Sequence, residues 1–172
     1  MVTIRESGMS FGPFESEDCL QLEASPLYAR IQQGTKMAEF ALRRVTSEAD
    51  ELWIIEAKQS VPNVDPNPGN FNDFIEGIRD KLINGLHVVF AIWLKRHSTA
   101  DTGVSAVFQA MSINQPAVKC ILVIRGVPND KLPPIQDAIQ KSMRVTCRTL
   151  GLLPAGVVAI NDEKARTWRL IT

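Results

Sequence analysis

Hydrophobic and polar residues alternate along two neighbouring runs of the chain, residues 35–44 and 51–60. A period of two is typical of strands that turn one face to a core. The short polar stretch VTSEAD lies between the runs, so the pair predicts an antiparallel hairpin. On one face of the second strand the apolar pattern ends in a charged pair, Glu56 and Lys58.

The chain after this hairpin alternates between helical and strand patterns. Residues 73–96 carry apolar side chains at steps of three and four, which predicts a long helix packed on a sheet. Residues 117–126 are a nearly continuous β-branched run, typical of a buried strand, and residues 133–152 form a proline-started amphipathic helix. A last short strand over 156–162 and a terminal helix or turn over 162–170 follow.

The chain before the hairpin is less regular. Residues 1–17 mix glycine, proline, serine and charge without a period, which predicts an irregular arm. Residues 18–25 predict a short strand. Ser25 and Pro26 then supply an N-cap and a proline at the first position of a short helix.

Two connecting segments complete the pattern. Residues 61–70 contain three prolines in ten positions and predict a loop, with Asn72 as the N-cap of the long helix. Residues 98–116 fit either a helix or a strand, and no element is assigned there. A hairpin followed by helix, strand, helix and strand predicts an α/β sandwich.

The composition is that of one globular domain. The chain has 172 residues, of which 45% are hydrophobic and 22% charged, enough for one core and too few for a second full domain. We therefore expect a single α/β domain over residues 1–172. The early charges and the short apolar runs predict neither a signal peptide nor a membrane span, so we expect a cytoplasmic protein with no membrane partner.

Charge and cysteine content exclude little beyond this. The formal net charge is zero, so the overall charge does not indicate nucleic-acid binding, although a local groove can be basic on a neutral protein. Cys19, Cys120 and Cys147 are odd in number and far apart, which argues against a disulfide framework and a structural zinc site.

The chemistry of the chain is concentrated around Glu56-Ala57-Lys58. Hydrolysis of a phosphodiester with a divalent ion needs carboxylates that fix the metal and a cation that activates water or stabilises charge. Strand positions i and i+2 lie about 6.5 to 7 Å apart on one face, so Glu56 and Lys58 can converge on one phosphate. Glu39 in the preceding strand would add a second carboxylate if the hairpin register places it on the same face.

This arrangement resembles the restriction-endonuclease-like PD-(D/E)XK superfamily, whose core runs helix, hairpin, helix, strand. The resemblance covers about residues 25–150 and implies a three-layer sandwich with a mixed central sheet flanked by helices. It implies that Glu39 and Glu56 bind Mg²⁺ or Mn²⁺ and that Lys58 positions the water or the charge. Gln59, which could bind a ligated water or a phosphate oxygen, and Glu23, the acid nearest the first core helix, are weaker candidates.

The resemblance implies a divalent-metal-dependent nuclease that acts on DNA in preference to RNA. It would dimerise or work with a partner protein that supplies specificity. One alternative is the same fold without catalysis, an interaction or regulatory subunit in which Glu56 and Lys58 form a structural ion pair. An unrelated α/β module that binds a small ligand is a third.

Simpler interpretations of the charged residues also stay open. Cross-strand ion pairs on a solvated sheet face would account for Glu39, Arg43, Glu56 and Lys58. A second tripeptide of the same kind starts at Asp162 and is interpreted as helix capping and solvated charge. Six basic residues are candidates for a phosphate-contacting rim if the fold brings them around Glu56: Arg43, Arg44, Lys95, Arg96, Lys119 and Arg125.

Overall fold

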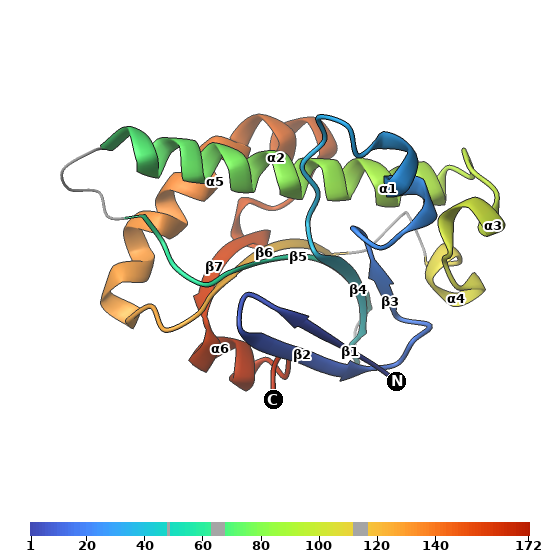
Figure 1. The fold of residues 1–172 in the computed structure, drawn as a ribbon, viewed down its shortest axis with the longest axis horizontal. Coiled ribbons are helices and arrows are strands. Elements are labelled where there is room, and N and C mark those ends of the chain that lie inside the picture. The colour runs from blue at the N-terminus through green and yellow to red at the C-terminus, as the bar shows by residue number, and fades with distance from the viewer. Residues whose placement is uncertain (48, 63–67, 112–116) are drawn as a thin grey trace.

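A computed structural model of the chain describes residues 1–47, 49–62, 68–111 and 117–172. A mixed five-stranded sheet, in the order β3-β4-β5-β6-β7, forms its centre (Figure 1). The first three strands pair antiparallel, and β5, β6 and β7 run parallel to one another. The strands are β3 (Cys19–Gln21), β4 (Phe40–Val45), β5 (Asp50–Lys58), β6 (Ala117–Ile124) and β7 (Val157–Asn161).

The two faces of the sheet are covered by different elements (Figure 1). Helices α2 (Pro68–Trp93) and α5 (Leu132–Leu150) cover one face, and the hairpin of β1 (Val2–Glu6) and β2 (Met9–Phe14) covers the other with α6 (Asp162–Thr167). This burial on both sides explains the continuous apolar sequence of β6. The remaining helices are short: α1 (Pro26–Ile31), α3 (Thr99–Thr102), α4 (Ala106–Gln109) and the 3₁₀ turns Asn129–Lys131 and Pro154–Gly156.

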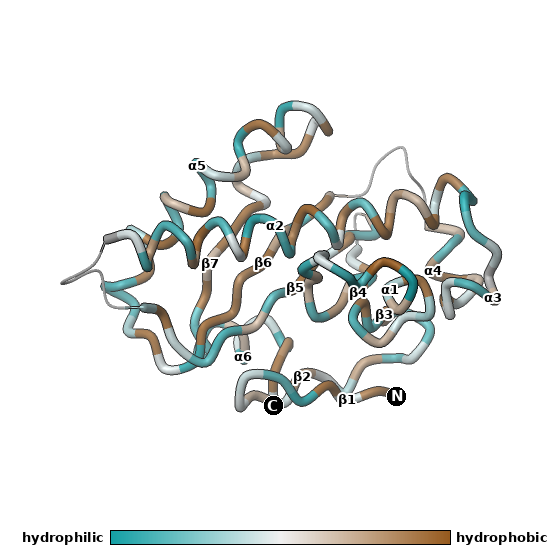
Figure 2. The backbone as a smooth tube through the Cα atoms, turned by 45° about the horizontal axis from the view of Figure 1, so that its top comes forward, coloured by the Kyte–Doolittle hydropathy of each residue, from teal (hydrophilic) through white to brown (hydrophobic). Residues whose placement is uncertain are grey.

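Helix α2 lies directly over β5. Hydrophobic and hydrophilic residues alternate along it at helical spacing (Figure 2), and its buried stripe includes Ile78, Leu82 and Leu86. Gly85 belongs to the same stripe, and a Cβ atom added there would lie 2.9 Å from Cγ2 of Ile54 on β5. The absence of a side chain at Gly85 therefore allows the close approach of helix and strand.

The structure confirms most of the regular elements expected from the sequence. The hairpin, the long helix, the buried strand, the proline-started helix and the last strand are all present as β4–β5, α2, β6, α5 and β7. The cap of α1 is also as expected, since Ser25 Oγ accepts a hydrogen bond of 3.1 Å from the amide of Tyr28.

The expected irregular arm over residues 1–17 is wrong. These residues form β1 and β2, which pair antiparallel. The hairpin buries Phe11 and Phe14 against Phe40, with ring centroids 5.3 and 5.7 Å apart. Glycine and proline suggested a break in regular structure, but the burial of aromatic side chains on the sheet outweighs their weak strand preference.

Some boundaries also differ from expectation. The first strand of the hairpin begins at Phe40 instead of residue 35, and α2 begins at Pro68, before the expected cap at Asn72. The unassigned segment 98–116 contains the short helices α3 and α4, and its last five residues lie outside the described part of the chain. Within the described ranges, no helix combines the length and the apolar character that crossing a bilayer requires.

Candidate functional site

Glu56 is a charged residue inside the core of the molecule. It is 0% exposed and lies on β5 between Ile54 and Lys58 on the face that α2 covers. The expected face assignment is therefore correct, but this face is not solvated. Because a buried carboxylate loses its hydration, its environment must supply compensating charge or protonate it.

Two lysines supply that charge. Lys58 Nζ lies 2.7 Å from Glu56 Oε1, and Lys81 Nζ, from α2, lies 3.0 Å from the same oxygen. Both Glu56 oxygens are buried, and neither makes a hydrogen bond of good geometry among the described residues. The two lysines therefore balance the charge of the carboxylate without satisfying its hydrogen-bonding capacity.

Glu39 joins this group from the residue before β4. Its amide donates to the carbonyl of Ile55 at 3.1 Å, and its carbonyl accepts from Leu22 at 3.0 Å, so its backbone is held between β5 and the end of β3. The side chain is only 8% exposed, and its Oε1 lies 3.5 Å from Lys81 Nζ. Glu39 and Glu56 therefore converge on one cation, as the sequence left open.

We call Glu39, Glu56, Lys58 and Lys81 the acid–lysine cluster. Burial and the neighbouring charge of Glu56 raise the pKa of Glu39 to about 7, although Lys81 partly opposes the shift. Burial also raises the pKa of Glu56 against the lowering effect of Lys58 and Lys81. Burial lowers the pKa of Lys81, but the carboxylates of Glu56 and Glu39 outweigh it and the net shift is upward. The cluster therefore favours the charged form of Lys81 and makes ionisation of Glu39 and Glu56 harder.

Lys81 is the functional candidate that the sequence analysis missed. It is half-buried, with 18% of its side chain exposed, on the face of α2 that packs on the sheet. The signal was present in the spacing, because Ile78, Lys81, Leu82 and Gly85 follow the three- and four-residue steps of the apolar stripe. A lysine that interrupts such a stripe indicates a buried acidic partner.

The weaker candidates lie at the margin of the cluster. Glu23 is exposed, and its Oε1 lies 3.7 Å from Lys81 Nζ. Gln59 is exposed directly after the end of β5. Lys58 is 31% exposed, so it connects Glu56 with the surface.

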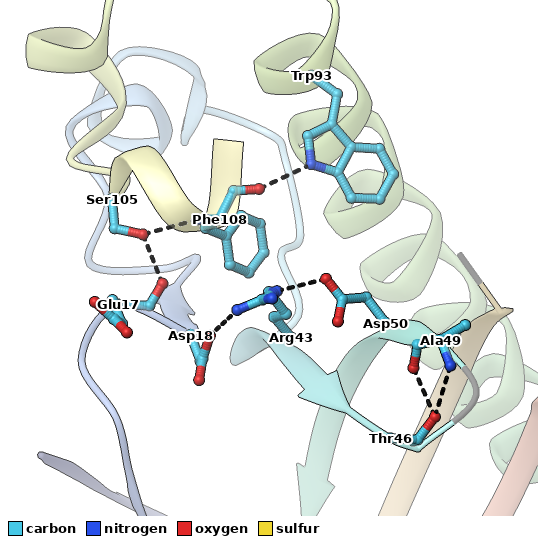
Figure 3. Close-up of polar contacts among 9 residues, drawn as sticks. All are labelled: Glu17, Asp18, Arg43, Thr46, Ala49, Asp50, Trp93, Ser105 and Phe108. Carbon is cyan, nitrogen blue, oxygen red and sulfur yellow. Dashed lines mark hydrogen bonds and ion pairs between the residues drawn. The ribbon is translucent and has the colours of Figure 1, made fainter. Parts of the chain in front are cut away.

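The expected basic rim is not assembled around Glu56. Arg43 pairs with Asp18 at 2.9 Å and Asp50 at 2.8 Å at the far end of β4 (Figure 3). Lys119 pairs with Glu51 at 2.8 Å near the start of β5.

Of the other rim candidates, three also lie away from Glu56. Arg44 contacts Trp168 beyond the opposite face of the sheet, and Lys95 and Arg96 follow the end of α2, roughly 20 Å along the helix axis from Lys81. Arg125 lies at the strand end that carries the cluster, where its amide donates to the carbonyl of Lys58 at 2.9 Å.

The second acidic tripeptide has the structural role that was expected. Asn161 caps α6 by accepting from the amide of Lys164, and the Asp162 carboxylate accepts from the amide of Gly126 at 2.8 Å. Asp162 also pairs with Arg166 at 3.0 Å. The Asp162 carboxylate is therefore engaged by a backbone amide and by Arg166 at the start of α6.

The cluster offers two carboxylates to a cation. Among the described residues, no three His, Cys, Asp or Glu side chains form a group that could hold a metal ion. Mg²⁺ is commonly bound through one or two carboxylates, with water and substrate phosphate completing its shell. The carboxylates of Glu39 and Glu56, the latter without a hydrogen bond among the described residues, fit that requirement.

No protein-family model, curated protein or solved structure matches the chain. The interpretation of the acid–lysine cluster therefore depends on its own geometry.

Proposed function

We propose that the protein is a divalent-metal-dependent nuclease that hydrolyses phosphodiester bonds at the acid–lysine cluster. The observation that carries the proposal is the buried Glu56 carboxylate, neither oxygen of which makes a hydrogen bond among the described residues, next to a second buried carboxylate on Glu39. Leaving a charged oxygen unpaired in a core is costly, and a bound cation removes that cost.

The raised pKa of Glu39 supports the same assignment. Two carboxylates that repel one another, one of them with a pKa of about 7, attract a divalent cation, which favours their charged forms. Glu39 and Glu56 would hold the metal. When bound, the metal polarises the phosphate and lowers the pKa of a water molecule.

The lysines would act on the substrate side of the cluster. Lys58 is partly exposed at the end of β5, where its amine can contact a phosphate oxygen and stabilise the negative charge that develops during hydrolysis. Lys81 holds Glu56 and Glu39 in place from α2. The order of the elements α1, β4–β5, α2 and β6 also follows the helix, hairpin, helix, strand order of the PD-(D/E)XK superfamily. This order supports the restriction-endonuclease-like fold class.

The first test is calorimetric titration of Mn²⁺ into the wild type, Glu56→Gln and Glu39→Gln. We expect binding to the wild type and its loss in both variants. Glu163→Gln is the matched control, since Glu163 belongs to the other acidic tripeptide and is exposed. Absence of Mn²⁺ binding to the folded wild type would overturn the proposal.

The second test is cleavage. We expect single- or double-stranded DNA, in preference to matched RNA, to be cut with Mg²⁺ or Mn²⁺ and not in EDTA. Lys58→Met should abolish cleavage while retaining Mn²⁺ binding. Light scattering with and without DNA tests the expected homodimer, and activity that requires an added protein would indicate a partner that supplies specificity.

A catalytically inactive interaction or regulatory subunit is the second candidate. It is favoured by the contacts of Lys58 and Lys81 with Glu56 Oε1 at 2.7 and 3.0 Å, since two lysines already neutralise the carboxylate. Under this alternative Mn²⁺ does not bind, and no phosphodiester substrate is cut.

A further inference from the structure

A separate basic hollow lies on the other side of the sheet. Arg44, near the end of β4, turns toward the face covered by the β1–β2 hairpin and α6. Its guanidinium lies 5.0 Å from the ring centroid of Trp53, and its Nη2 donates to the carbonyl of Trp168 at 3.3 Å. The stacking and the hydrogen bond fix its orientation.

A second arginine, Arg169, lines the same hollow. Arg169 follows α6 with a φ of 55°, a left-handed conformation that is uncommon for a residue other than glycine. Burial lowers the pKa of Arg44 and the positive charge of Arg169 lowers it further, although Glu51 partly opposes the shift. Among the described residues, neither Arg44 nor Arg169 has a carboxylate within ion-pair distance. Glu51, which lies opposite Arg44 on β5, is itself paired with Lys119 at 2.8 Å.

The two arginines line a hollow of about 320 Å³. Asp18 also lines it, but Asp18 is neutralised by Arg43, which Asp50 holds from its other side (Figure 3). Glu15 is the other acidic lining residue and is exposed. The hollow therefore carries an excess of guanidinium charge.

We propose that this hollow binds a phosphate group through Arg44 and Arg169. A guanidinium presents parallel N–H donors that match two phosphate oxygens, and two guanidinium groups together match the charge of a phosphate monoester. The site is independent of the acid–lysine cluster, since Arg44 and Glu56 lie on opposite faces of the sheet. Its phosphate would be a terminal or free monoester, or a phosphodiester of a nucleic acid backbone.

The test is calorimetric titration in EDTA, which prevents metal-dependent cleavage. The probes are inorganic phosphate, a 5′-phosphorylated oligothymidylate and the same oligomer without its 5′ phosphate. Binding of inorganic phosphate and of the 5′-phosphorylated oligomer alone identifies a terminal or free phosphate, and equal binding of both oligomers identifies the backbone.

The variants decide whether the arginines form the site. Arg169→Gln, at an exposed position, should weaken binding about tenfold or more, equivalent to about 1.4 kcal/mol. Arg44→Gln should do the same, with thermal unfolding as a check because Arg44 packs on Trp53. Arg166→Gln is the control, since Arg166 is exposed and already paired with Asp162. Failure of all three probes to bind, or equal weakening by Arg166→Gln and Arg169→Gln, would overturn the proposal.

Discussion

Glu56 shows how one residue can couple stability to chemistry. It is wholly buried and its Oε1 lies next to two lysines, but neither oxygen makes a hydrogen bond among the described residues. A fully compensated buried ion pair would also satisfy its oxygens with hydrogen bonds, and a solvated pair would not be buried. The Glu56 carboxylate can therefore still bind a cation, and its incomplete pairing lowers the stability of the folded state.

Removal of Lys81 should lower the free energy of unfolding. Lys81→Met leaves Glu56 with Lys58 alone, and breaking a buried pair costs about 3 to 5 kcal/mol. We expect a lower urea concentration at the midpoint of unfolding, with an unchanged slope of the unfolding free energy against urea concentration. Lys141→Met, at an exposed position of α5, is the control and should change stability by less than about 0.5 kcal/mol. A loss in Lys81→Met no larger than in the control would show that the cluster is not held by this pair.

Glu39 should make stability depend on pH. Its folded pKa of about 7 lies above its value of 4.5 in an unfolded chain, so the folded state binds more protons between these limits. The contribution of Glu39 is fully present below about pH 4.5 and is lost as the pH rises through 7, by up to about 3 kcal/mol. Urea unfolding at several pH values measures the slope of the unfolding free energy against pH. Glu39→Gln should remove the part of this slope that Glu39 causes. An unchanged slope in Glu39→Gln would contradict the assignment.

At the scale of elements, the approach of α2 to β5 decides where Lys81 lies. Gly85 follows Lys81 by one turn and faces Ile54, which precedes Glu56 by two residues on the same strand face. The pattern of three- and four-residue steps predicts the helix, but the sequence does not say which strand it covers. A side chain at Gly85 would push the helix away from the cluster.

Two glycines of α2 provide a matched pair. Gly85→Ala places a Cβ 2.9 Å from Ile54, 3.2 Å from Leu22 and 3.3 Å from Ala38, so the clash should outweigh the better helix propensity of alanine and lower stability. Among the described residues, a Cβ at Gly77 would meet only Lys36 Nζ, at 3.7 Å, so Gly77→Ala should raise stability by about 0.5 to 1 kcal/mol. Thermal unfolding measures both. Equal stabilisation of the two variants would show that α2 does not depend on Gly85 for its approach.

At the scale of the whole molecule, the chain ends complete the second face of the sheet. The β1–β2 hairpin and the C-terminal residues lie together under β4 and β5 (Figure 1), and Thr172 donates its amide to the carbonyl of Ser10 at 3.2 Å. Phe11 is fully buried and pairs with Ile171 in an isolated bridge. This face would otherwise expose the aromatic and aliphatic side chains of the central strands.

The hairpin should therefore contribute to global stability. Phe11→Ala removes a fully buried ring that lies 5.3 Å from the ring of Phe40, and such a change costs about 3 to 5 kcal/mol. Val145→Ala, at a side chain that is 76% exposed, should change stability by less than about 0.5 kcal/mol. Chemical denaturation measures both. A small loss for Phe11→Ala would mean that residues 1–17 pack only loosely on the sheet.

The sequence by itself determined the type and order of the main elements and the strand face that carries Glu56 and Lys58. Periodicity carries this information because side chains alternate along a strand and repeat every three to four residues along a helix. It also indicated the cap of α1 and the structural role of Asp162, since both depend on neighbouring residues.

Only the tertiary structure decided which distant residues meet. The meeting of Glu39 with Glu56 depends on the pairing of β4 with β5, and the contribution of Lys81 depends on where α2 crosses the sheet. The dispersal of the expected basic rim and the position of Arg44 and Arg169 at one hollow likewise depend on strand order and on the fold of the chain ends. Contacts between residues far apart in the chain are set by packing, register and burial, and local pattern does not encode them.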